Sequence, residues 1–142
     1  MKKILVSVCA ALVMTTCGFG QTDKFKTIIG QWEFAGEDGA TASLTIADSA
    51  TILLTYMGEQ KKIVQYKMDF SKSPCWFDFA ATDSGSTVQV KSLLQIVSDD
   101  ILKWQLFIDE DRPQHFTSGS GEIFYLKRSR VNKDIIAAAS RQ

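Results

Sequence analysis

The chain has 142 residues, 16 Lys and Arg against 16 Asp and Glu, and 45% hydrophobic residues. This length predicts one domain with a sizeable core, and the ordinary charged and aromatic fractions exclude wholesale disorder. Because phosphate binding needs a basic face, the zero net charge argues against nucleic acid as a partner.

The N-terminus has the pattern of a secretory signal. Two lysines precede an apolar run over residues 4–14, which is shorter than the roughly 20 residues that a membrane span takes. Small residues at Gly18 and Gly20 predict a signal peptide over residues 1–20, cleavage before Gln21, and export to the periplasm or the medium. Cys17 leaves open a lipoprotein anchored to the membrane through that thiol, and an uncleaved segment is a third alternative.

The rest of the chain reads as short alternating runs separated by turn residues, which is typical of an all-β domain. Strands are expected at 27–35, 41–47, 51–57, 62–70, 75–80, 87–97, 101–108 and 122–128. Connections of hairpin length favour an antiparallel, up-and-down order. We therefore expect an eight-stranded antiparallel barrel over residues 21–131, with an open sandwich as the alternative. A helical turn at 22–27 and a tail over 132–142 with helix-forming residues are expected to flank it.

The segment Gly30-Gln31-Trp32 resembles the G-x-W signature of the lipocalin and fatty-acid-binding-protein superfamily. In that superfamily the Trp packs across the closed end of the barrel, under a basic residue of the last strand. The resemblance implies that Trp32 and Arg128 close one end of this barrel, with a cation–π contribution of about 0.5–2 kcal/mol. A Trp that merely packs in an ordinary core is the alternative.

Further segments follow the order found in a family of small exported bacterial lipocalin-like domains. They are residues 66–79 with a D-x-S-K-x-P loop, residues 99–102, the R-P-x-x-F segment 112–116, and the final Leu126-Lys127-Arg128. Ser98-Asp99 departs from the pattern, since the family more often has Gly at that turn. The family has no established activity, so the resemblance implies a fold and leaves the function open.

Patterns of catalytic or metal-binding residues are missing from the sequence. The single histidine, His115, lies in a polar connection over 109–121, and no G-x-S-x-G motif occurs. After signal cleavage, His115 and Cys75 are the whole supply of His and Cys ligands for a metal. We therefore expect no enzyme, no cofactor and no metal site, and we expect Cys75 to be a buried small hydrophobe. Arg112 is expected to brace the 109–121 connection against the barrel mouth, with simple exposure or ligand contact as alternatives.

The barrel interior is the candidate for function, because apolar concave sites are the usual form of small-molecule pockets. The candidate ligand-binding residues are Tyr56, Tyr66, Met68, Phe77, Phe79, Trp104 and Leu106. They form a binding site only if their faces point inward, and a register error of one residue would invert the set. The preferred function is binding of a small hydrophobic ligand; the alternative is a filled barrel acting as a protein-interaction or envelope-structural module.

Overall fold

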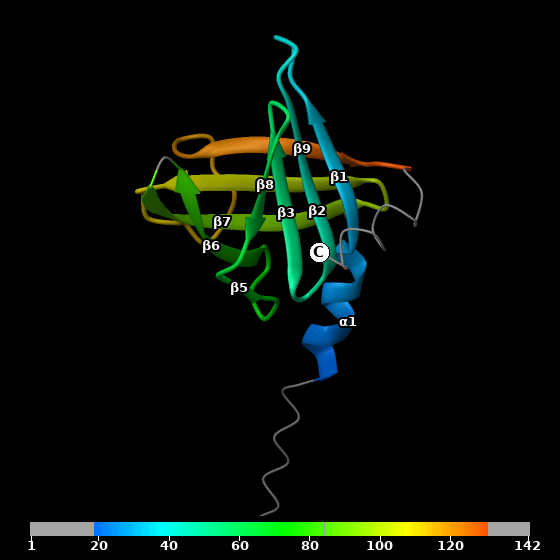
Figure 1. The fold of residues 1–142 in the computed structure, drawn as a ribbon. Coiled ribbons are helices and arrows are strands. Elements are labelled where there is room, and N and C mark those ends of the chain that lie inside the picture. Colours follow the sequence, from blue (N-terminus) through cyan, green and yellow to red (C-terminus); the bar gives the residue numbers. More distant parts are fainter. Residues whose placement is uncertain (1–18, 84, 131–142) are drawn as a thin grey trace, which may run out of the picture.

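The structure of the chain, a computed structural model, describes residues 19–83 and 85–130 (Figure 1). In chain order its elements are α1 (Phe19–Ile28), β1 (Gly30–Ala35), β2 (Thr41–Asp48), β3 (Thr51–Tyr56), β4 (Glu59–Ile63), β5 (Tyr66–Asp69), β6 (Cys75–Asp83), β7 (Ser86–Ser98), β8 (Ile101–Ile108) and β9 (Glu122–Arg128). The helix includes the expected helical turn at 22–27. The expected signal segment up to residue 18 and the expected tail over 132–142 lie outside the described residues.

All strands belong to one antiparallel sheet in the order β4-β3-β2-β1-β9-β8-β7-β6-β5. The sheet curls into a nearly closed barrel because β1 pairs with β9, which joins the first and last strands of the meander. This confirms the expected all-β, antiparallel barrel and its up-and-down order, and the open sandwich is excluded.

The expected strand at 62–70 is divided in two, so the described residues form nine strands where eight were expected. Its first part, β4, pairs with β3 through Ile63 opposite Ile52. Its second part, β5, pairs with β6 through Tyr66 opposite Phe79. The chain changes partner at Val64, whose side chain is 76% exposed although it continues the apolar alternation. β4 and β5 are the two edge strands of the sheet and do not pair with each other. The barrel is therefore not fully closed between them.

The turns between strands follow from local chemistry. Met57 and Gly58 both have positive φ (49° and 84°), as a two-residue type I′ hairpin between β3 and β4 requires. In the β2–β3 turn the carboxylate of Asp48 accepts a hydrogen bond of 2.8 Å from the backbone N–H of Ala50. These short turns set the register that sends alternate side chains into the barrel.

The core lies inside the barrel, toward the end that α1 covers. Its buried residues are Ile28, Trp32, Leu44, Ile46, Ile52, Ile63, Cys75, Phe77, Phe79, Val90, Leu94, Leu102, Trp104 and Leu126. Phe25 and Phe70, whose rings meet edge to face at 6.2 Å, pack against this core from α1 and from the end of β5. Burial of apolar side chains at about 25 cal/mol per Å² is the main stabilising term for such a core.

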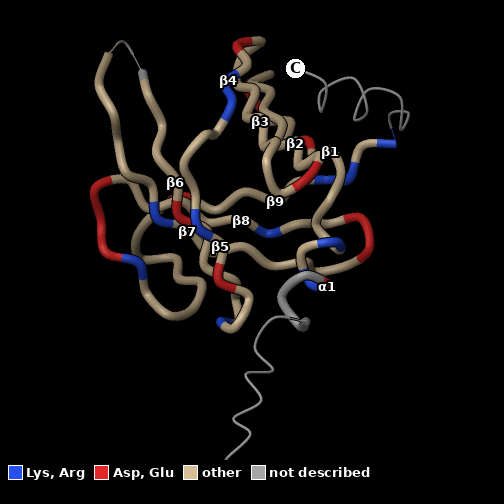
Figure 2. The backbone as a smooth tube through the Cα atoms, turned by 60° about the horizontal axis from the view of Figure 1, so that its bottom comes forward, with Lys and Arg blue, Asp and Glu red and all other residues tan. Residues whose placement is uncertain are grey.

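The connection between β8 and β9 lies on the outer face of the barrel. Gln105, fully buried, donates hydrogen bonds of 2.6 and 2.7 Å to the carbonyls of Thr117 and Ser120. Beside it Leu93 and Phe107 are also fully buried, although neither belongs to the interior core. The connection therefore covers a second, smaller apolar patch on strands β7 and β8. Figure 2 shows acidic and basic residues on many parts of the chain, with some of the acidic residues in continuous stretches.

Candidate ligand-binding cavity at the open end of the barrel

One end of the barrel is closed by Trp32 and Arg128, which are paired across β1 and β9. The guanidinium carbon of Arg128 lies 4.0 Å from the centroid of the Trp32 ring. The same guanidinium donates to the backbone carbonyls of Ile29 (2.9 Å), Thr27 (3.1 Å) and Asp99 (3.0 Å). The indole N–H of Trp32 is satisfied by the carbonyl of Ile28 at 2.9 Å. Trp32 and Arg128 thus lie together at the closed end, in the arrangement that the resemblance implied.

Gly30 makes this arrangement sterically feasible. Its φ is +144°, and a Cβ at this position would lie 2.8 Å from Nη1 of Arg128. A side chain at this position would displace the guanidinium from the end of the barrel. The two-residue spacing of the Gly30-x-Trp32 motif therefore places the small residue under the guanidinium and the ring across the core.

At the opposite end the barrel holds a cavity of about 540 Å³. Its lining residues are Phe34, Gly36, Glu37, Asp38, Ala40, Ala42, Ser43, Leu54, Tyr56, Trp104, Leu106, Glu122, Phe124 and Leu126. They come from β1, the β1–β2 hairpin, β2, β3, β8 and β9. Most of the lining is apolar or aromatic, and the rings of Phe34 and Phe124 meet edge to face at 5.2 Å.

Three of the seven predicted ligand-binding residues line this cavity. Tyr56 lies at its mouth and is 61% exposed, whereas Trp104 is nearly fully buried and Leu106 is half-buried. Two further predicted residues, Phe77 and Phe79, are buried in the core against Trp104, with each ring centroid 6.0 Å from that of the indole. They pack against Trp104 and do not line the cavity themselves.

The last two predicted residues lie elsewhere. Tyr66 and Met68 line a separate hollow of about 420 Å³ together with Phe25 and Ile29, beside α1. The hydroxyl of Tyr66 donates to the carbonyl of Ser49, and partial burial, with a smaller contribution from Asp48, raises its pKa. All seven residues therefore face the interior or pack against it, but tertiary structure divides them among the cavity, the solid core and this second hollow.

Several further residues line the cavity without having been predicted from the sequence. Phe34 follows Trp32 by two residues, and Leu126 and Phe124 precede Arg128 by two and four. Because side chains two apart share a face of a strand, the closed-end pair could have identified all three as inward. Glu122 continues the same alternation, two residues before Phe124, whereas Glu37 lies in the β1–β2 hairpin, where no alternation applies.

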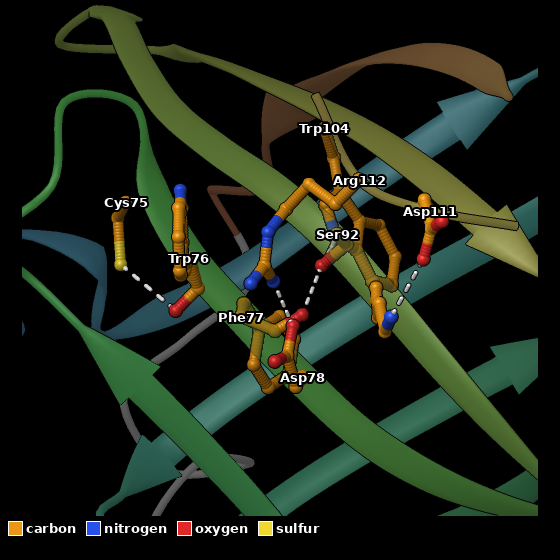
Figure 3. A network of polar contacts seen from close by, with 9 residues as sticks. Cys75, Trp76, Phe77, Asp78, Ser92, Trp104, Asp111 and Arg112 are labelled. Carbon is orange, nitrogen blue, oxygen red and sulfur yellow. Dashed lines mark hydrogen bonds and ion pairs between the residues drawn. The ribbon is translucent and has the colours of Figure 1, made fainter. Parts of the chain in front are cut away.

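Arg112 braces the long connection, but on the outer face of β6 and not at the cavity mouth (Figure 3). Its guanidinium pairs with Asp78 and lies 3.9 Å from the centroid of the Trp76 ring. The side chain is 8% exposed, and its Nε is buried without a hydrogen-bond partner among the described residues. The expectation of a brace is met, whereas the expected position was wrong because the connection folds back over the sheet. The local acid Asp111 pairs instead with Lys91 at 3.3 Å.

Cys75 and His115 differ in their surroundings. Cys75 is a buried free thiol, and burial raises its pKa to about 12, which confirms the expectation of an unreactive, hydrophobe-like residue. His115 is exposed in the connection and does not line the cavity. Across residues 19–83 and 85–130, no group of three or more His, Cys, Asp and Glu side chains could hold a metal ion.

Within the described part of the chain, no helix has the length and apolar character needed to cross a membrane. Comparison with known proteins found no matching family model, no matching curated protein and no matching solved structure.

Proposed function

We propose that the protein binds a small apolar molecule in the cavity at the open end of the barrel. The observation that carries this proposal is the cavity itself, whose volume of about 540 Å³ lies within the range of about 300–1,000 Å³ common for small-molecule sites. Its floor and walls are built by Trp104, Leu126, Leu54 and Phe34. A barrel with a solid interior throughout would leave no such volume.

The affinity would come mainly from apolar burial. A ligand that loses about 200 Å² of apolar surface would gain about 5 kcal/mol before the costs of ordering. The cavity walls stand on paired strands whose neighbours hold them in place, so little protein entropy would be lost on binding. Binding without covalent chemistry is the activity that such a lining supports.

We also propose that the chain is a lipocalin-like protein that is exported after cleavage before Gln21. The placement of Gly30, Trp32 and Arg128 at the closed end supports the first part, and the signal pattern of residues 1–20 supports the second. Anchoring through Cys17 is the competing route. The intact mass of the protein isolated from an exporting cell separates the two, since a chain starting at Gln21 and an acylated chain starting at Cys17 differ in mass.

Native mass spectrometry of the protein, followed by denaturing extraction, tests the proposed binding. We expect a stoichiometric apolar molecule, or uptake of added decanol with a change in Trp fluorescence. The variant Ala42→Phe puts a ring into the cavity and should abolish the uptake. Thr55, on the neighbouring strand β3, lines a separate groove with Gln31 and Glu33 and does not line the cavity. Thr55→Phe is therefore the matched control and should bind like the parent.

The alternative function, a protein-interaction or envelope-structural module, predicts the opposite result. A folded parent protein that takes up no apolar probe, and whose behaviour Ala42→Phe leaves unchanged, would overturn the carrier proposal. The outer surface would then be the place to search for a partner.

A further inference from the structure

The charged residues that line the cavity are all of one sign. Glu37 and Asp38 stand in the β1–β2 hairpin, and Glu122 begins β9. No Lys, Arg or His is among the residues that line the cavity. Acidic residues also follow one another outside the cavity, at Asp99–Asp100 and Asp109–Asp111, so the position of Glu37, Asp38 and Glu122 at the cavity is what bears on the ligand.

These carboxylates have no cationic partner within the described chain. Neither Glu37, Asp38 nor Glu122 takes part in an ion pair among residues 19–83 and 85–130. The one hydrogen bond that involves them is local, from the backbone N–H of Ala40 to the carboxylate of Asp38 at 3.1 Å. The negative charge at the mouth is therefore available to an incoming molecule.

The walls add an independent reason to expect a positive charge. Four aromatic side chains line the cavity: Phe34, Tyr56, Trp104 and Phe124. Aromatic faces attract ammonium groups through the ring quadrupole, and clusters of rings are the usual means of binding them. Tyr56, which is 61% exposed at the mouth, stands where such a head group would lie when the apolar part of the ligand is inside.

We propose that the ligand is a cationic amphiphile, with an apolar body inside the barrel and a protonated amine at the acidic mouth. This inference rests on the proposed function and specifies its ligand class. It makes fatty acids, whose carboxylate would face Glu37, Asp38 and Glu122, poor ligands. Because the three carboxylates are exposed to solvent, each contributes modestly, and salt should weaken their combined effect.

Three probes with the same alkyl chain test the proposal: decylammonium, decanol and decanoate, each titrated below its micelle concentration at pH 7. Calorimetry and Trp fluorescence of the full chain report the affinities. We expect decylammonium to bind at least about tenfold tighter than decanoate at low salt, with decanol between them. Raising the salt to about 0.5 M should narrow this preference, because the charges are solvated.

Charge-neutralising variants locate the effect. Glu37→Gln with Glu122→Gln should reduce the ratio of decylammonium to decanol affinity by about fivefold. The matched double variant Asp100→Asn with Glu110→Gln removes the same charge from exposed positions that do not line the cavity, and it should keep the parent ratio.

The outcomes separate this inference from the proposed function. If all three probes bind equally, or decanoate binds most tightly, the barrel is a carrier and the preference for a cation is wrong. If the variant Asp100→Asn with Glu110→Gln changes the ratio of decylammonium to decanol affinity as much as Glu37→Gln with Glu122→Gln does, the preference arises from the net charge of the protein. The acidic mouth is then not its source. If no probe binds to the folded protein, the proposed function fails and this inference fails with it.

Discussion

The indole N–H of Trp104 donates a hydrogen bond of 2.9 Å to the hydroxyl of Ser92, and that hydroxyl in turn donates to the backbone carbonyl of Phe77. Ser92 is fully buried on β7, and its two hydrogen bonds link β6 to β8 inside the barrel wall. These hydrogen bonds hold the ring of Trp104 in place, and this ring forms part of the cavity floor. The shape of the candidate site thus depends on a serine that does not line it (Figure 3).

Replacing Ser92 by Ala should destabilise the protein by about 1–3 kcal/mol, because it leaves the indole N–H buried without an acceptor. Urea unfolding measures the loss. In a Trp104→Phe background the same substitution should cost less, since only the bond to the Phe77 carbonyl is then lost. Equal costs in the two backgrounds would show that the two side chains are not coupled.

Gly30→Ala should destabilise the protein more than Gly39→Ala does. Both glycines have positive φ, +144° and +81°, so both substitutions introduce backbone strain of about 1–3 kcal/mol. Only at Gly30 does the new Cβ also meet Arg128, at 2.8 Å, whereas nothing lies within 4 Å of a Cβ at Gly39. Thermal unfolding of the two variants gives the difference, and an equal or reversed order would contradict the steric role of the motif.

Asp78→Ala should release the long connection from the outer face of the barrel. The substitution leaves the guanidinium of Arg112, 8% exposed, without its carboxylate, and we expect a cost of about 2–3 kcal/mol. Asp111→Ala breaks the exposed pair with Lys91 and should cost less than about 0.5 kcal/mol. Faster amide exchange over residues 112–120 in the first variant alone is the expected signature, and similar exchange in both would argue against a brace at Arg112.

The stability of the protein should fall at high pH in a way that depends on Cys75. The pKa of its thiol is about 12 in the folded state, against about 8.5 in an unfolded chain. Because the folded-state pKa is the higher one, the contribution is fully present below about pH 8.5 and is lost as the pH rises through 12. The free energy of unfolding of the parent should therefore decline more steeply between pH 9 and 11, roughly, than that of Cys75→Ala. Parallel declines would place the thiol in contact with solvent.

Alternation and turn residues in the sequence predict the class of fold and which residues of a strand share a face, but not which face points inward. Alternation over 101–108 predicts that Leu102, Trp104 and Leu106 share a face, and all three lie in the interior core or pack against it. These features are local, because a strand's period of two and a turn's φ angles depend only on neighbouring residues. The closed end was implied by the resemblance that Gly30, Trp32 and Arg128 carry, and the structure pairs Trp32 with Arg128 there.

Tertiary structure decided where the interior is solid and where it is hollow. Phe77 and Trp104 have the same sequence signature and both belong to the buried core, yet only Trp104 also lines the cavity, because the packing of other strands sets the free volume around each. The change of partner at Val64 and the pairing of Arg112 with Asp78 also depend on contacts between distant segments. Alternation tells which residues of a strand share a face, but the register and curvature of the whole sheet determine whether that face points inward and what it meets.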